Sequence, residues 1–435
     1  MSYQQAPIVP DPAESTPPGA HVPVPTQRAA TKVVATMAIA QFGLFVALLA
    51  PVTVSLALKT QTLFDGDTGA AAVANASILS VAAFFALVAN PVFGRLSDLT
   101  TARLGRRRTW MVIGLVFFVV SQLIVALAPS VPVLLVGWCL AQVAGNAILA
   151  PLLATIADQV PHEQRGSVSA NVGVMQNLGI LAAAYIASFF VSNMLALFLV
   201  PALIAVVTVG IYCLVLPDQR LTERPDLGGW VALLKTFWVN PLQHRDFAWA
   251  WISRFLMTLG VFFFITFRLF YLQAEIGLTA EDATRVLTLG VLLHTIALVI
   301  TAKIGGWLSD KLNRRKIFVI ASTAIVGVAL AMLAHATTVP AFYAVEIVMG
   351  IGYGVYVAVD TALVIDVLPN PDDAAKDLGV LNIANALPQS LAPAIGALIL
   401  GIGRVAGANY TALFWAAVIT VVLGALTIIP IKSVR

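Results

Sequence analysis

The sequence GRLSD at residues 94–98, followed by the basic cluster GRRR at 105–108, decides how this chain folds. The same pattern returns as GWLSD at 306–310, followed by NRRK at 313–316. Each copy lies between two long apolar runs, and the copies are about half a chain apart. A short polar loop that recurs once per half, between apolar helices, predicts a duplicated helical bundle in a membrane.

The composition excludes an ordinary soluble domain. Of the 435 residues, 60% are hydrophobic and only 11% are charged, and the mean hydropathy is +0.93. Such a chain needs lipid to cover its apolar surface, and in lipid the backbone must satisfy itself as helix or closed barrel. The apolar runs are about 20 residues long and lack the strict alternation of barrel strands, so they predict helices.

These runs predict an all-α membrane protein with twelve transmembrane helices in two pseudo-symmetric six-helix bundles. We expect the helices near residues 33–58, 69–93, 109–128, 131–157, 168–192, 194–216, 247–273, 282–303, 317–335, 339–366, 378–400 and 410–430. The predicted domains are a disordered cytoplasmic tail over 1–31, a first bundle over 32–216, a cytoplasmic central loop over 217–246 and a second bundle over 247–435. The tail carries seven prolines and almost no apolar periodicity.

The basic residues predict the orientation. With the N-terminus inside, most of the 25 Lys and Arg fall on the cytoplasmic side, while Lys59, Arg285 and Arg404 lie outside. This positive-inside pattern predicts a multi-pass protein of the cytoplasmic membrane with both termini in the cytoplasm. The net charge of +4 is spread over short loops instead of one soluble face, so we expect no nucleic-acid partner.

The two halves align beyond the loop motif. Asp98 and Asp310 are 212 positions apart, and Asp158 and Asp366 end later helices at nearly the same offset. Two parallel six-helix halves are typical of transporters that rock about a central site.

On these residues, the span 33–430 resembles the major facilitator superfamily, with the two G-x-L-S-D loops in the helix 2–3 and 8–9 positions. The first loop, together with DQVP at 158–161 and Arg165, is similar to glycoside–pentoside–hexuronide and sucrose-type cation symporters. The resemblance implies a cavity lined by helices 1, 4, 7 and 10. Members coupled to cations have acidic residues in helices 1, 2 or 4, where this chain offers amides, so coupling carboxylates would come from the second half.

The loop residues predict a latch between the bundles. Gly94 and Gly306 would let a neighbouring helix approach closely. Asp98 and Asp310 would accept hydrogen bonds from the N-termini of helices 11 and 5, where the helix dipole favours an anion. The alternative is that the loops only hold positive charge in the cytoplasm. The candidate gating residues are Gly94, Asp98, Arg106, Arg107, Arg108, Gly306, Asp310, Arg314 and Arg315.

Four charged residues lie within predicted spans, where charge is costly and usually functional. Counting residues from the helix ends places Arg254 at the depth of Asp360, and Arg268 at the depth of Glu346. We predict that the first pair couples transport to protons and that the second is an outer gate. Structural ion pairing is the alternative for both. We expect His294 to be a packing residue, and a titrating role in coupling is the alternative.

Amide and aromatic side chains predict the substrate site. Trp138, Gln142 and Asn146 recur at i, i+4 and i+8 on one face of a helix. Amides both donate and accept hydrogen bonds, and an aromatic face packs on a sugar ring. The alternative for each amide is to join helices. The candidate contacts are Gln41, Trp138, Gln142, Asn146, Gln176, Tyr353, Tyr356, Asn385 and Gln389.

The sequence therefore predicts a secondary active transporter that moves a small polar solute, such as a sugar or glycoside, by alternating access with protons as the coupling ion. The alternative is a proton-driven exporter of amphipathic or drug-like compounds, which Phe262, Phe263, Phe264 and Phe267 would suit unless they face lipid. A receptor or scaffold would leave the two loops unexplained. We expect no enzymatic activity, cofactor or metal, because no such motif is present, and we expect a monomer.

Overall fold

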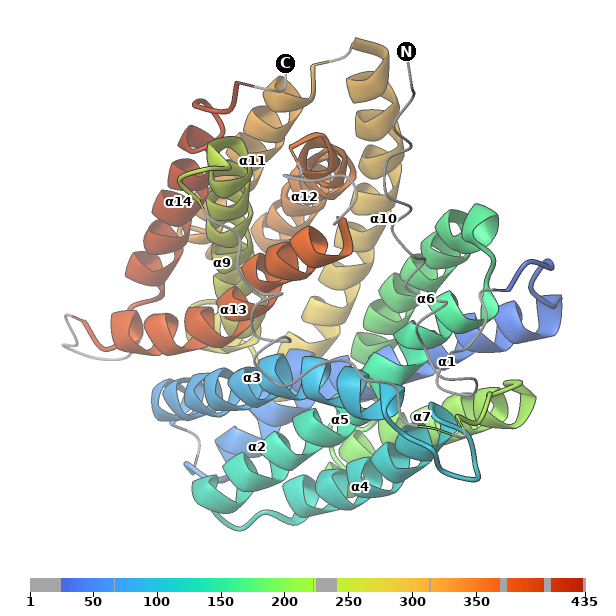
Figure 1. Ribbon diagram of the computed structural model, residues 1–435. Coiled ribbons are helices and arrows are strands. Elements are labelled where there is room, and N and C mark those ends of the chain that lie inside the picture. The colour runs from blue at the N-terminus through green and yellow to red at the C-terminus, as the bar shows by residue number, and fades with distance from the viewer. Residues whose placement is uncertain are drawn as a thin grey trace, which may run out of the picture.

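The computed structural model describes residues 25–65, 67–221, 223, 241–312, 314–367, 374–402 and 408–432. Most of the predicted tail and central loop lies outside these residues. Within them the regular structure is helical throughout. The helices form two groups, α1–α7 and α9–α14, which lie against each other (Figure 1).

The first bundle holds six spans. Its elements are α1 (Thr31–Ala50), η1 (Pro51–Ser55), α2 (Leu56–Thr62), α3 (Thr68–Asp98), α4 (Arg108–Leu127), α5 (Val131–Gln159), α6 (His162–Phe189) and α7 (Met194–Val215). The first three form one continuous span with a π-helical segment at its centre. Pro51 has no backbone N–H to donate within the helix. The Leu56 N–H donates to the Pro51 carbonyl five residues back, which is the hydrogen bond of a π-helix.

The second bundle holds the other six spans. Its elements are α9 (Arg245–Ala274), α10 (Ala280–Leu312), α11 (Arg315–Leu333), α12 (Val339–Asp366), α13 (Ala374–Leu400) and α14 (Tyr410–Leu426). Eleven helices of the described chain are long and apolar enough to cross a membrane, and α14 is a shorter apolar helix. The prediction of a twelve-helix membrane fold is confirmed.

Two boundaries differ from the sequence prediction in a way that matters for the motif. The segments GRLSD and GWLSD, expected in loops, are the last turns of α3 and α10. Neither segment contains a residue that stops a helix, so both helices continue past the apolar run. The basic residues Arg106, Arg107 and Arg314 that follow lie outside the helices, and Arg108 and Arg315 begin the next ones.

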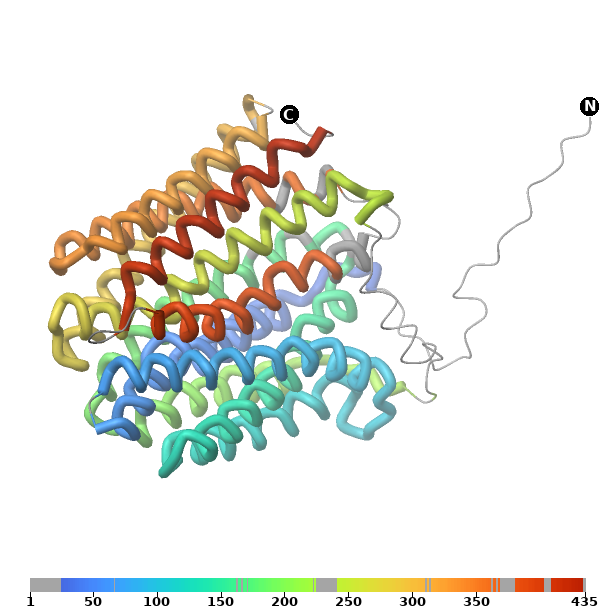
Figure 2. The backbone as a smooth tube through the Cα atoms, turned by 90° about the vertical axis from the view of Figure 1, so that its left-hand side faces the viewer, coloured from blue at the N-terminus to red at the C-terminus, as the bar shows by residue number. Residues whose placement is uncertain are grey.

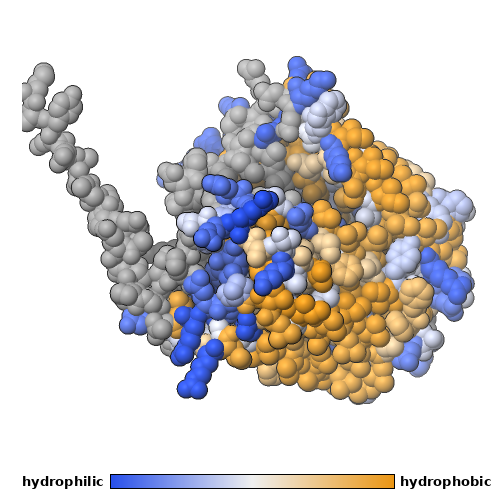
Figure 3. Space-filling view, turned by 90° about the vertical axis from the view of Figure 1, so that its right-hand side faces the viewer, coloured by the Kyte–Doolittle hydropathy of each residue, from blue (hydrophilic) through white to orange (hydrophobic). Residues whose placement is uncertain are grey.

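Apolar side chains cover the outer surface. Figure 3 shows a broad, continuous apolar face with hydrophilic residues gathered at its edges. Leu214 and Leu398 are among the most exposed side chains, on helices from different bundles. Water would not support such a surface, so the chain is a multi-pass membrane protein.

The helices of both bundles run roughly side by side (Figure 2). We call the end where α1 begins and α14 ends the termini end, and the opposite end the far end. The bundles meet along α3 with α13 and along α6 with α10. Ser80 of α3 and Ser390 of α13 exchange hydroxyl-to-carbonyl hydrogen bonds, and the Thr288 hydroxyl of α10 donates to the Ala184 carbonyl of α6.

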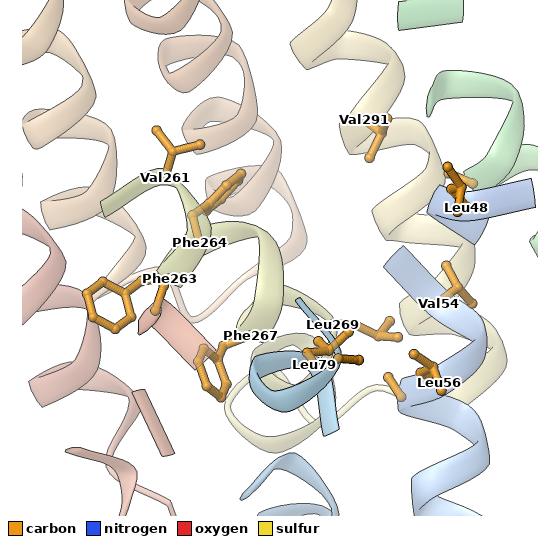
Figure 4. Close-up of a cluster of buried hydrophobic side chains, with 14 of the residues drawn as sticks. Leu48, Val54, Leu56, Leu79, Val261, Phe263, Phe264, Phe267, Leu269 and Val291 are labelled. Atoms are coloured by element: carbon orange, nitrogen blue, oxygen red, sulfur yellow. The ribbon is translucent and has the colours of Figure 1, made fainter. Parts of the chain in front are cut away.

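All four of these residues lie in the half of their helices nearer the far end. An apolar cluster completes the contact there: Figure 4 shows Leu79 of α3 beside Leu269 of α9, with Val54 of η1 and Leu56 of α2 on the neighbouring span. The far end is therefore closed by direct contact between the bundles.

Candidate functional site

Two buried ion pairs join α9 to α12. The Arg254 guanidinium donates from Nε to Asp360 Oδ2 at 2.6 Å, and its Nη2 contacts the same oxygen. The Arg268 Nη1 donates to Glu346 Oε1 at 2.9 Å. The contact that equal depth predicted is present for both pairs, while their roles in transport stay predictions. Each pair lies between apolar helices, where a lone charge would be far more costly.

The second pair has further partners. His294 of α10 places Nδ1 3.4 Å from Glu346 Oε2, so the carboxylate has a basic group at each oxygen. The Arg268 guanidinium also lies 5.0 Å from the centre of the Phe264 ring, within range of a cation–π contact. Glu346 is completely buried, whereas the His294 side chain is 18% exposed.

Sequence reasoning missed the place of His294 beside this pair. A lone histidine in an apolar helix carries no pattern, and its partner is on another helix. The signal that could have found it is the glycine spacing of α12, which brings α10 close to Glu346.

Predicted substrate contacts in the first bundle are largely engaged in helix packing. Asn146 Oδ1 accepts from Asn90 Nδ2 at 3.0 Å, and its Nδ2 donates to the Gln142 carbonyl. Trp138 has no exposed surface. In this conformation Asn146 joins α5 to α3, whereas Gln142 is half-buried and the Trp138 Nε1 has no hydrogen-bond partner among the described residues, so the role of the stripe as a substrate contact stays a prediction.

Gln41 and Gln176 come together from α1 and α6. The Gln41 Nε2 donates to Gln176 Oε1 at 3.5 Å, and the Gln41 Oε1 has no hydrogen-bond partner in the structure. A buried amide oxygen without a partner is costly, and a bound hydroxyl would satisfy it. These two amides remain the best placed of the predicted contacts in the first bundle.

The second bundle contributes aromatic and amide groups. The rings of Tyr353 and Tyr356 are stacked with centroids 6.2 Å apart. Gln389 is exposed on α13 and donates to the Asn385 carbonyl. Gln389 lies nine residues from the strongly exposed Leu398, which puts the two on opposite faces of the helix. Since Leu398 faces lipid, Gln389 faces the interior of the protein.

The first basic cluster forms a dense network at the termini end. Arg107 bridges Asp98 at 2.6 Å and Asp158 at 2.8 Å, and Arg106 also pairs with Asp158. Arg107 further donates to the Ser97 hydroxyl. Burial disfavours the charged guanidinium, but the carboxylates of Asp158 and Asp98 outweigh it, and the pKa of Arg107 is raised.

Asp218, which no sequence pattern singles out, anchors this loop. Its Oδ2 accepts from the backbone N–H of Arg107 at 2.9 Å and of Arg108 at 2.8 Å, at the start of α4. Burial raises the pKa of Asp218, and the two N–H donors offset only part of that effect. Gly105 has φ of +104°, and a Cβ there would lie 2.1 Å from Asp218 Oδ2, so this position requires glycine.

The second basic cluster is described only in part. Arg314 is exposed at the N-cap of α11, and Lys316 donates to the carbonyls of Ile429 and Ile431 after α14. Lys311 lies over the Trp307 ring. The side chains of Asp310 and of the first turn of α13, the predicted helix 11, lie outside the described residues, so the predicted latch across the bundles stays a prediction.

Gly94 and Gly306 are not tightly packed in this conformation. A Cβ at Gly94 would meet nothing within 4 Å, and one at Gly306 would meet only Ala358 of its own bundle, at 3.5 Å. Their expected role, close approach to a helix of the other bundle, stays a prediction.

The phenylalanines of α9 do not face lipid. Phe263, Phe264 and Phe267 are almost completely buried, and Figure 4 shows them among apolar neighbours. Phe262 is partly buried against the same core. They are packing residues of the second bundle and offer no open aromatic surface.

The sequence matches a known family over nearly its whole length. The family model described as Major Facilitator Superfamily matches residues 33–393 and 285–434. A Bacillus subtilis (strain 168) protein described as the uncharacterized MFS-type transporter YfiU is 28% identical over 111 residues, which are 26% of this chain and 21% of that protein. The alignment thus spans about a fifth of that relative.

Solved structures share the fold over nearly the whole chain. A crystal structure of the nucleoside transporter NupG superposes with a TM-score of 0.70 at 13% identity, over 93% of this chain and all of that one. A point variant of NupG gives 0.72 at 12% identity, over 92% and 99%. A bacterial homologue of the human lysosomal transporter Spinster, inward-facing and unoccupied, gives 0.67 at 12% identity, over 91% and 94%.

Proposed function

The chain belongs to the Major Facilitator Superfamily, and we propose that it is a proton-coupled transporter of a small polar solute, a sugar or glycoside. A secondary transporter of this family works by alternating access, without enzymatic chemistry. The solute class and the coupling ion are the proposed part. The observation that carries the proposal is the buried Arg254–Asp360 pair, flanked by Tyr353 and Tyr356 on the same helix.

The pair suits proton coupling because two effects on the carboxylate oppose each other. Asp360 is buried and accepts a hydrogen bond from Arg254. Burial in general favours the protonated form of a carboxyl group, and a neighbouring guanidinium favours the ionised form. A movement of Arg254 away from Asp360 during rocking would leave a buried carboxylate that takes up a proton. Binding of the solute could drive that movement by offering hydrogen-bond acceptors to Arg254.

The polar groups support a neutral, hydroxyl-rich solute. Gln41 with Gln176 on one bundle, and Tyr353 with Gln389 on the other, offer donors and acceptors without net charge. Nucleosides are N-glycosides and carry both hydroxyls and an aromatic base, so they join sugars at the head of the solutes to test. The solved structure of the nucleoside transporter NupG suggests this addition, although its likeness to this chain is one of fold alone.

Contact at the far end supports an inward-open state. With both termini in the cytoplasm, the far end faces the outside, and the Ser80–Ser390 and Leu79–Leu269 contacts close it. The buried phenylalanines of α9 lend no support to an exporter of amphipathic compounds, so import is the direction we propose.

Uptake into proteoliposomes tests the function. Labelled nucleosides, hexoses and disaccharides would be offered with and without an inward-directed proton gradient. We expect at least one class to accumulate only with the gradient. Asp360→Asn should abolish that accumulation while sparing exchange of solute across the membrane, and Glu281→Gln, in an exposed pair at the far end, should do neither. If the Asp360→Asn protein still concentrates solute, the Arg254–Asp360 pair is a structural ion pair and not the coupling site.

A further inference from the structure

Three ionisable side chains share one face of α12. Glu346, Tyr353 and Asp360 follow at intervals of seven residues, which is close to two helical turns. Each interval corresponds to about 10 Å along the axis. Tyr356 fills the second interval, with its ring stacked on Tyr353. The stripe thus leads from one buried carboxylate of the second bundle to the other.

The first interval is filled by a residue of α10. A Cβ at Gly350 would lie 2.4 Å from the His294 carbonyl, and one at Gly354 would lie 2.5 Å from the Leu298 carbonyl. Gly350 and Gly354 form a G-x-x-x-G pair, which lets two membrane helices approach backbone to backbone. This close approach holds His294 against α12, between Glu346 and Tyr353.

The resulting neighbours form a continuous series. The His294 Nδ1 is 3.4 Å from Glu346 Oε2, and its ring centre is 6.4 Å from that of Tyr353. The ring centres of Tyr353 and Tyr356 are 6.2 Å apart, and the buried Tyr356 hydroxyl lies near Arg254 and Asp360 without a direct hydrogen bond among the described residues. Each member of the series from Glu346 to Asp360 can both accept and donate a proton.

We propose that His294, Tyr353 and Tyr356 form a proton path that joins Glu346 to Asp360. The path rests on the proposed proton coupling and adds residues that the two ion pairs alone do not require. A proton leaves the carboxylic acid at one end and reaches the carboxylate at the other. The imidazole takes it on one nitrogen and releases one from the other, and each phenol replaces its own proton as it passes one on. Neighbours exchange directly or through one water.

The charged groups at the two ends of the path link the opening of one ion pair to the closing of the other. Glu346 is faced by Arg268 of α9 and His294 of α10, and Asp360 by Arg254 of α9 and Tyr356 of its own helix. Each carboxylate therefore has one arginine that is released when the acid form appears. The two ion pairs share one proton, so the pair nearer the far end closes when the pair nearer the termini end opens.

Infrared spectroscopy tests the path without any solute. Purified protein in nanodiscs would be moved from H2O to D2O at a pH where the Glu346 carboxyl band is present, the band being assigned as the one that Glu346→Gln removes. Glu346 has no exposed surface and His294 Nδ1 lies beside its second oxygen, so the path predicts that its proton exchanges through His294. We expect exchange at Glu346 to be at least about 100-fold slower in His294→Gln than in the unmodified protein. Because the His294 side chain is 18% exposed and exchanges with solvent itself, Tyr353→Phe is read at the band of the buried Asp360, assigned as the one that Asp360→Asn removes, where we expect a similar slowing.

The control is Tyr343→Phe, which removes a phenol one turn from Glu346 that is not a member of the series, and it should leave the rate within about twofold of the unmodified protein. Unchanged rates in both path variants would overturn the proposal, as would a Glu346 band that never changes with pH. Tyr353→Phe keeps the test decisive if His294→Gln does not fold. Solute accumulation by Asp360→Asn protein would overturn the proposed coupling but not the path. The path is judged separately, from the rates of proton exchange.

Discussion

The two copies of the loop motif have nearly the same sequence and different surroundings. In the first copy, Arg107 is buried and holds two carboxylates, and Asp218 caps the start of α4. In the second, Arg314 is exposed and Lys316 binds backbone carbonyls beyond α14. The repeated motif thus fixes where a polar turn lies, and in the first copy its partners make that turn a rigid network; Asp310 and Asp366, the matching carboxylates of the second copy, have side chains outside the described residues. In the first copy those partners are Asp158 and Asp218, supplied by α5 and by the chain after α7.

Removing one arginine from each copy should separate the two copies most clearly. Arg107→Ala removes a buried guanidinium, leaves Asp98 without this partner and leaves Asp158 with Arg106 alone, which should cost about 3 kcal/mol of stability. Arg314→Ala changes an exposed side chain and should stay within about 0.5 kcal/mol. Thermal unfolding of the purified proteins in detergent measures both. Equal losses would show that the two loops are equivalent after all.

Glycine substitutions sharpen the contrast within the first copy. Gly105→Ala places a side chain at positive φ and against Asp218, so we expect a loss of about 1–3 kcal/mol. Gly94→Ala meets no neighbour in this conformation and lies within α3, so it should raise the stability by about 0.5–1 kcal/mol. If the outward-open state brings α13 close to Gly94, transport should slow in Gly94→Ala although stability does not fall. Normal transport in that variant would remove Gly94 from the predicted latch.

The latch itself is tested at Asp98. Its side chain is 40% exposed and pairs with Arg107, so Asp98→Asn should cost little in the observed state. Loss of an anion from a facing helix N-terminus should weaken closure of the termini end by roughly 0.3–2 kcal/mol. Transport should slow while solute affinity in detergent stays nearly the same. Transport at the unmodified rate would argue that the first loop is only topogenic.

The smallest expected effect is a pH dependence at Asp218. Because burial raises the pKa of Asp218 in the folded chain, the fold binds that proton more tightly than the unfolded chain does. The stabilising contribution is present below the unfolded pKa and is lost as the pH rises through the folded pKa. Asp218→Asn should remove this part of the pH dependence of the unfolding temperature. Identical pH profiles for Asp218→Asn and the unmodified protein would exclude the effect. Lys316→Gln, in the second loop, is the control and should keep the pH dependence of the unmodified protein.

Much of the fold was open to sequence reasoning because lipid imposes a simple rule. A backbone in hydrocarbon must form helices, so apolar runs of sufficient length map directly onto spans. Depth along a helix follows from counting residues, which is why the sequence pairs Arg254 with Asp360 and Arg268 with Glu346 correctly. The spans and the depths can both be read along a single helix, without knowing how the helices pack.

The candidate site was less predictable because it depends on which faces meet. Asn146 has the spacing of a ligand contact, yet its amide oxygen is taken by Asn90 of α3. His294 has no pattern of its own and gains its place beside Glu346 from the close approach at Gly350. The rotation of each helix about its axis is set by packing between helices, and a short polar side chain reaches only the neighbour that this rotation presents.

The sequence alone determined that this chain spans a membrane twelve times in two related halves, because hydrophobic length and the repeated motif are written along one helix at a time. Tertiary structure alone decided that the first basic cluster is locked by Asp158 and Asp218, that Asn146 joins α5 to α3, and that His294 stands beside Glu346. Those outcomes depend on contacts between residues far apart in the chain, and the free energy of such contacts exists only once the helices are packed.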